Sequence, residues 1–159
     1  MSIKRAIQWP VLLISIVVFS VACGSGEPVE LRPGDVAASG TINGAEWTFY
    51  DGVAEPQDGS DELYFTLSDD LIGGCGEVDS IGTIRFAGFS LAAEPGEYSA
   101  FIGLNDNDLS GSEWSFQGHS SSGTVTIDEV ADGIIYGSFV ADFEDENSAS
   151  GDFAALDCR

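Results

Sequence analysis

Short runs in which apolar and polar residues alternate make up the chain from Ser39 onward, with clusters of Gly, Asp, Asn and Ser between them. A period of two predicts half-buried β-strands, because successive side chains of a strand point to opposite faces. No sustained helical period interrupts this pattern. The segments expected as strands are Gly40–Ile42, Glu46–Val53, Glu62–Leu67, Gly82–Phe89, Glu97–Ile102, Glu113–Gln117, Gly123–Glu129, Ile134–Phe143 and Gly151–Leu156.

The spacing of these segments predicts one all-β domain, an antiparallel β-sandwich or flattened barrel of about eight to nine strands. Asn43 and Gly44 indicate a type I′ hairpin, since both central residues of that turn need a positive φ. The alternation also predicts which side chains face the core. Core-facing sets are Leu63, Phe65 and Leu67, then Val125 and Ile127, then Ile135, Phe139, Ala141 and Phe143; Tyr64, Thr66, Thr124, Thr126 and Asp128 are expected to face water.

The first 22 residues have the organisation of a secretory signal peptide. Lys4 and Arg5 form a positive start, and an uncharged apolar stretch follows from Trp9 to Ala22. This stretch is shorter than the roughly twenty residues that a membrane-spanning helix needs. We therefore expect residues 1–22 to be a signal peptide, residues 23–38 a flexible linker and residues 39–159 the β-domain.

The end of this signal, Phe19-Ser20-Val21-Ala22-Cys23, resembles the lipobox of bacterial lipoproteins, with Ser20 at the position where that pattern most often has Leu. The resemblance implies cleavage before Cys23 and a diacylglyceryl group on its sulfur. It also implies an extracytoplasmic location in the cell envelope, anchored by lipid to the outer membrane or cell surface. An ordinary secreted protein cut nearby is the alternative. Gly24-Ser25-Gly26 suits a tether, because small residues make flexible chain.

Two further motifs are shared with a wider group. Residues 40–47 have the pattern G-x-I-x-G-x-x-W, and the C-terminal part contains Ser122–Ile127, then G-x-F-x-A from Gly137 to Ala141, then Ser150-Gly151-x-Phe153. Together they resemble a loose group of small bacterial lipoproteins of unknown function. The resemblance implies an all-β mature domain that opens on a tryptophan hairpin and closes on a three-stranded meander. It implies no active site.

The charge of the chain is strongly negative. All 27 acidic residues lie after residue 22, where only Arg32, Arg85 and Arg159 are basic, so the mature net charge is 3 − 27 = −24. Such a surface repels the phosphates of nucleic acids and anionic lipids, which bind through Lys and Arg. Nucleic-acid binding is excluded on this ground. The acidity is explained either by a saline habitat or by the gathering of divalent cations, and the two are compatible.

The cysteines divide into one lipidated residue and one pair. With Cys23 acylated, Cys75 and Cys158 remain, and an even pair in an oxidising compartment predicts a disulfide. The closed loop would contain 158 − 75 + 1 = 84 residues. A metal site using both thiolates is the alternative, but it lacks a second close cysteine pair or nearby histidines.

A calcium site is suggested by Asp106-Asn107-Asp108-Leu109-Ser110-Gly111, which matches the first half of a calcium loop. Asp106, Asp108 and Ser110 would be the ligands. The second half does not match, because Gln117 stands where a bidentate Glu is expected. Glu113 or the acidic residues 142–146 would then have to complete the site. The alternative is a polar hairpin turn in an acidic protein.

No catalytic arrangement stands out. His119, the only histidine, lies in residues 118–123, which we expect to form a turn, and Ser120–Ser122 beside it do not establish a triad. Gly88–Ala92 lacks the last glycine of a nucleophile elbow. Five aromatic residues would supply stacking faces for a glycan or peptide, but packing in the core is the simpler interpretation: Trp47, Trp114, Tyr50, Tyr64 and Tyr136.

These observations predict a lipid-anchored, extracytoplasmic envelope protein that is not an enzyme. It would act as a binding or structural module, needing no cofactor and reaching the membrane through its anchor; its protein or glycan partner is unknown. A calcium-binding β-sandwich module is the second hypothesis. A surface hydrolase that uses two carboxylates is the third, although 27 acidic residues make any such pair uninformative.

The charge generates the first testable prediction. Raising NaCl from about 0.1 to 1 M should increase the melting temperature, because screening weakens repulsion among carboxylates. Mg²⁺ and Ca²⁺ should act alike, and Asp106→Ala or Asp108→Ala should leave their effect unchanged. Thermal melts in each salt measure this. A Ca²⁺-selective shift at millimolar or lower concentration, abolished by either substitution, would instead support the calcium site.

Overall fold

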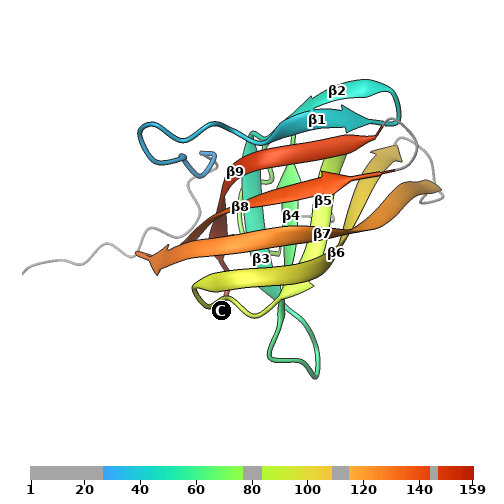
Figure 1. Cartoon of the computed structure of the whole chain (residues 1–159). Helices are drawn as coiled ribbons and strands as arrows, with labels where there is room; N and C mark the ends of the chain where they lie inside the picture. The colour runs from blue at the N-terminus through green and yellow to red at the C-terminus, as the bar shows by residue number, and fades with distance from the viewer. Residues whose placement is uncertain (1–26, 77–83, 109–114, 144–146) are drawn as a thin grey trace, which may run out of the picture.

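The computed structural model describes residues 27–76, 84–108, 115–143 and 147–159, and these contain nine strands and no helix (Figure 1). The expected signal peptide, Cys23 and Ser110 lie outside the described residues. No helix among the described residues is long and apolar enough to cross a membrane. The strands are β1 (Ser39–Ile42), β2 (Ala45–Thr48), β3 (Asp51–Pro56), β4 (Leu63–Ser68), β5 (Ile84–Leu91), β6 (Gly96–Asp108), β7 (Ser115–Ala131), β8 (Ile134–Asp142) and β9 (Ser148–Asp157).

All nine strands belong to one sheet, in the order β2-β1-β9-β3-β4-β5-β6-β7-β8, and β9 also pairs with β8. The additional pairing closes β3 to β9 into a seven-stranded barrel, with β1 and β2 outside it. Every pairing of named strands is antiparallel except the short one between β3 and β9. The expected all-β, antiparallel class is confirmed.

Strand β9 makes the closure possible because its two edges are used differently. One edge pairs with β8 along nearly its whole length, from Ser148 to Leu156. The other edge is divided: Ser148–Ser150 pairs with β1, Asp152 bridges to Ala37, and Leu156 and Asp157 pair with β3. β9 is therefore the element from which both the barrel and the outer hairpin extend.

The expected β1–β2 hairpin is confirmed. Asn43 and Gly44 have φ values of 50° and 75°, as a two-residue type I′ turn requires. Asp132 and Gly133 connect β7 to β8 with nearly the same values, 55° and 79°. The meander of β7, β8 and β9 that the family resemblance implies is also present, since each strand pairs with the next.

Two expected boundaries are wrong. Residues 118–123, expected as a turn, lie inside β7, because the long strand β6 offers backbone partners continuously from Gly96 to Asp108. Glu46–Val53, expected as one strand, is divided between β2 and β3. The chain bends at Phe49 and Tyr50, whose N–H groups donate to Ala38 and Ser68. These bonds carry the chain from the outer hairpin into the barrel wall.

The interior is filled by large aromatic side chains. Phe65 stacks on Phe89 with ring centroids 5.0 Å apart, and Phe153 meets both rings edge-on at about 6 Å. Phe139 links this group to Trp47, 6.4 Å away. Of the residues expected in the core, all are buried except Phe143, which packs against it partly buried: Leu63, Phe65, Leu67, Val125, Ile127, Ile135, Phe139 and Ala141.

The outer face of β4 differs from expectation. Thr124, Thr126 and Asp128 are on the outside of β7, as predicted, but Thr66 is only 2 % exposed. Its neighbour across the pair, Val53, is buried too, and Ile72 from the segment after β4 is held close by. Burial likewise raises the pKa of the Tyr64 phenol. Alternation predicts on which face of β4 a side chain lies. It does not predict that another part of the chain covers the outer face.

The described part of the expected linker lies against the barrel. Val36 and Ala38 exchange backbone hydrogen bonds with Asp152 of β9, and Val29 donates to the carboxylate of Asp51. Arg32 lies over the Tyr136 ring, 4.2 Å from its centroid. We call residues 29–38 the N-terminal arm. In the structure, hydrogen bonds to β3 and β9 tie this arm to the barrel.

Gly137 of β8 generates the second prediction. A Cβ there would lie 2.2 Å from the Thr126 carbonyl oxygen and 2.9 Å from the Phe153 ring. Gly137→Ala should therefore lower the free energy of unfolding by about 1–3 kcal/mol through overpacking. Gly103→Ala is the matched control, because its Cβ would meet the end of the Asn105 side chain at 3.2 Å. Urea unfolding that shows equal losses for both variants would contradict the prediction.

Candidate functional site

The predicted calcium ligands do not lie in a turn where the structure describes them. Asp106 and Asp108 belong to strand β6, and the backbone of Asp106 pairs with Arg85 of β5 and Gln117 of β7. Among the described residues, no group of three or more His, Cys, Asp or Glu could hold a metal ion. The calcium site stays a prediction, since Ser110 and the following residues are outside that part of the chain.

Of the other sequence candidates, the structure describes the side chain of Trp47 and the backbone of His119. Trp47 is 1 % exposed, so packing in the core is the correct interpretation for it. His119 lies within β7, its backbone opposite Leu104 of β6. Trp114 is not among the described residues. Strand pairing places Ser120, next to His119, two strands away from Gly88 of β5, with Gly103 of β6 between them.

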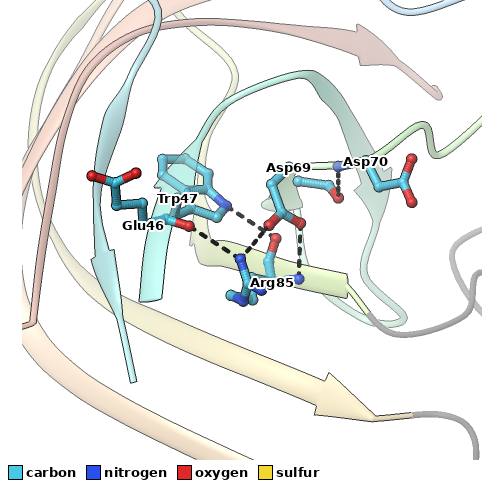
Figure 2. Close-up of polar contacts among 6 residues, drawn as sticks. Glu46, Trp47, Asp69, Asp70 and Arg85 are labelled. Atoms are coloured by element: carbon cyan, nitrogen blue, oxygen red, sulfur yellow. Dashed lines mark hydrogen bonds and ion pairs between the residues drawn. The ribbon is translucent and has the colours of Figure 1, made fainter. Parts of the chain in front are cut away.

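A polar cluster lies around Arg85, between β2, the end of β4 and the start of β5 (Figure 2). Its Nη1 donates to the Asp69 carboxylate at 3.0 Å and to the Glu46 carbonyl at 3.1 Å. The Arg85 carbonyl accepts from the Trp47 indole at 3.0 Å and from the Asp69 N–H at 3.1 Å. Asp69 in turn accepts from the Arg85 N–H at 3.0 Å.

This cluster is a connection between strands rather than a reactive site. It joins β2, β5 and the end of β4, and it gives the indole N–H of the buried Trp47 a partner. The arginine side chain is 33 % exposed and the Asp69 side chain 21 %, so the ion pair itself contributes little beyond its hydrogen bonds. The sequence signal for it was weak, because Asp69 and Arg85 are 16 residues apart.

The most buried carboxylate, Asp51, is surrounded by backbone donors. It is 3 % exposed, and its Oδ1 accepts from the N–H groups of Val29 and Gly52 at 3.1 and 2.9 Å. Its Oδ2 accepts from Ile72 at 2.9 Å and Gly73 at 3.3 Å. Four donors compensate the cost of burying this charge. Asp51 therefore joins the N-terminal arm, β3 and the segment after β4.

The C-terminus is fixed by the expected disulfide. Cys75 and Cys158 are bonded, with Cα atoms 5.6 Å apart, and the Cys158 N–H donates to the Ala54 carbonyl. A hydrogen bond from the Arg159 side chain holds the pKa of the adjacent Asp157 carboxyl below its ordinary value. The bridge thus joins the end of β9 to the segment that leaves β4.

One outer face of the sheet is exposed and carries little charge. Directly paired residues form a row across six strands from β2 to β6: Thr48, Ser39, Ser150, Val140, Thr124 and Ser99. All six are exposed, and five of them carry a hydroxyl group. The next row, two residues along each strand, includes Glu46, Thr41, Ser148, Asp142, Ser122 and Phe101. We call the residues of these two rows the hydroxyl face.

Alternation in the sequence does not single out this face. Alternation predicts that Thr124 points outward, but it does not say which strands will be neighbours. Ser39, Thr48 and Ser150 come from the two ends of the chain, and only the pairing of β1 with β9 brings them together. Runs of alternate Ser and Thr at residues 122–126 and 148–150 were the available signal.

Comparisons with known protein families, with curated proteins and with solved structures find no match to this chain. No family is therefore established, and arguments about function depend on the residues themselves.

Asp51 generates the third prediction. Asp51→Asn replaces one acceptor oxygen by an amide NH₂, so a donor would face backbone N–H groups, and the free energy of unfolding should fall by about 2–3 kcal/mol. Asp70→Asn is the control, since Asp70 is exposed and accepts from its neighbour Leu71. Denaturant unfolding should show a change within about 0.5 kcal/mol there. Equal effects would mean that the buried donors do not need the carboxylate.

The disulfide generates the fourth prediction. Reduction should lower the melting temperature, because an 84-residue loop is released; the chain-entropy model gives about 4–5 kcal/mol for it. The double variant Cys75→Ala, Cys158→Ala should melt at the reduced protein's temperature and should not respond to reductant. A melting temperature of the unsubstituted chain that is the same with and without reductant would contradict this.

Proposed function

We propose that this chain is a lipid-anchored envelope protein whose β-domain acts outside the cytoplasm as a non-catalytic binding or structural module. The observation that carries the proposal is the Cys75–Cys158 disulfide, since stable disulfides are typical of oxidising, extracytoplasmic compartments. It agrees with the signal-like N-terminus and with the lipobox-like sequence that ends at Cys23.

The position of the N-terminal arm limits how far the barrel could stand from such an anchor. Val29 is the first of the described residues with a hydrogen bond to the barrel, and residues 24–28 lie between it and Cys23. Six Cα–Cα steps span at most about 21 Å. An anchored barrel would therefore stay close to the bilayer, whereas a linker that ended at residue 38 would let it stand further away.

The non-catalytic part of the proposal is supported by the roles of the polar side chains that are described. The carboxylates of Asp51 and Asp69 accept hydrogen bonds from backbone groups, and Arg85 is paired. The interior of the barrel is occupied by Phe65, Phe89 and their aromatic neighbours. An outer surface is then the part of the domain best suited to contact a partner.

Removal of the acylated cysteine is the test and the fifth prediction. Cys23→Ser should move the protein from the membrane fraction to the soluble extracytoplasmic fraction, because the acyl chains that hold it would be missing. Ser25→Ala, two residues away, should leave it in the membrane. Metabolic labelling with radioactive palmitate should mark the unsubstituted chain and the control only. A Cys23→Ser chain that stays membrane-bound as before would refute the anchor.

A further inference from the structure

We propose that the Cys75–Cys158 disulfide is a redox latch: its reduction by a dithiol opens the barrel between β3 and β9 while the rest of the sheet stays paired. This inference goes beyond the proposed function and does not depend on acylation of Cys23. We call the contact of residues 52–54 with residues 154–158 the seam. It lies where the chain approaches its C-terminus, which is marked in Figure 1.

The seam is the shortest strand pairing of the barrel wall. β3 and β9 pair through Val53 with Leu156 and Ala54 with Asp157, and these two pairs are parallel. In contrast, β3 and β4 form six pairs and β8 and β9 form nine. Parallel pairs are also slightly less stable per residue than antiparallel ones. A local opening therefore costs less free energy at the seam than elsewhere in the wall.

The backbones of β3 and β9 are close along the whole seam. A Cβ on Gly52 would lie 2.8 Å from the Ala154 carbonyl oxygen, so only glycine permits this approach. At the far end, the Cys158 N–H donates to the Ala54 carbonyl at 3.0 Å, and the disulfide leaves from the same residue. The bridge therefore lies at the end where the seam would begin to open.

The bridge holds the seam through the segment that follows β4. This segment is bound to β3 at two places. The N–H groups of residues 72–73 donate to the Asp51 carboxylate, and the Gly76 N–H donates to Glu55 at 2.6 Å. Cys75 lies between these two attachments, so its disulfide ties the end of β9 to a segment that is itself bound to β3. Without the bridge, backbone hydrogen bonds alone hold the end of β9 to β3.

The segment around Cys75 gains much freedom when the bridge opens. Gly73, Gly74 and Gly76 surround the cysteine, and their φ values are 90°, 142° and 75°. Glycine loses more conformational freedom on folding than any other residue. Release of Cys75 therefore returns conformational entropy to this segment, and that entropy opposes its attachment to β3.

The disulfide is open to a reductant because Cys75 is exposed, whereas Cys158 is half-buried. A thiolate of the dithiol attacks the Cys75 sulfur, and the S–S bond breaks with its electron pair leaving on Cys158. The second thiol of the reductant then displaces Cys75 and forms the reductant's own disulfide. The two cysteines take up two electrons and two protons and end as thiols.

Amide hydrogen exchange, measured by NMR on the ¹⁵N-labelled full chain in detergent, is the experiment. With dithiothreitol, the amides of residues 156–158 should exchange at least about tenfold faster, through local opening. The amides of residues 124–127, between β7 and β8, should accelerate by a smaller factor. Low urea should hardly change the new rate at residues 156–158, since a local opening exposes little surface. The double variant Cys75→Ala, Cys158→Ala should show the same pattern without reductant.

Gly123→Ala is the matched control, with the bridge intact. A Cβ on Gly123 of β7 would meet the Ile102 side chain and would lie 2.5 Å from the Val140 carbonyl oxygen. This substitution should therefore destabilise the sheet at β7 and β8 through overpacking. Exchange at residues 124–127 should then rise more than exchange at residues 156–158, which is the reverse of the pattern expected on reduction.

Two outcomes would overturn the inference. Unchanged exchange at residues 156–158 after reduction would mean that strand pairing alone holds the seam. An equal acceleration at residues 156–158 and 124–127 would mean that the bridge stabilises only the whole fold against unfolding. Membrane release by Cys23→Ser is measured separately, so a failure of the latch leaves the anchor untouched.

Discussion

Strand β9 is the constraint on which the architecture depends. The seven-stranded sheet closes into a barrel because β9 pairs with β3 on one edge and with β8 on the other. Its pairing with β8 is local in sequence, whereas its pairing with β3 joins the last strand of the chain to one near residue 50. The short parallel contact at Leu156 and Asp157 would be weak alone. The adjacent disulfide at Cys158 and the bond from Cys158 to Ala54 hold it closed.

Irregular segments of the chain also meet near this junction between β3 and β9. Asp51 lies at the start of β3 and binds both the N-terminal arm and the segment that leads from β4 to Cys75. A buried carboxylate is stable there because it replaces its lost water by backbone N–H groups that these segments would otherwise leave without a partner. Closure of the barrel, docking of the arm and covering of β4 therefore support one another.

The negative charge of the chain bears on which partners it can contact, and the packing of its core bears on its stability. A net charge of −24 keeps the domain soluble and disfavours anionic partners. Glycines such as Gly137 let neighbouring backbones and the Phe153 ring approach closely in the core, so stability comes from packing.

The sequence by itself determined the local features: the all-β class, the Asn43-Gly44 turn and the inward sets such as Phe65 and Leu67. It also indicated the Cys75–Cys158 pair, on the expectation that Cys23 is acylated and leaves only these two cysteines to form a bridge. Only the tertiary structure decided that residues 118–123 continue a strand, that Thr66 is covered and that the arm is docked. Each of these depends on a partner distant in sequence, since hydrogen-bonding strands and covering segments are chosen by the whole fold and leave no local pattern.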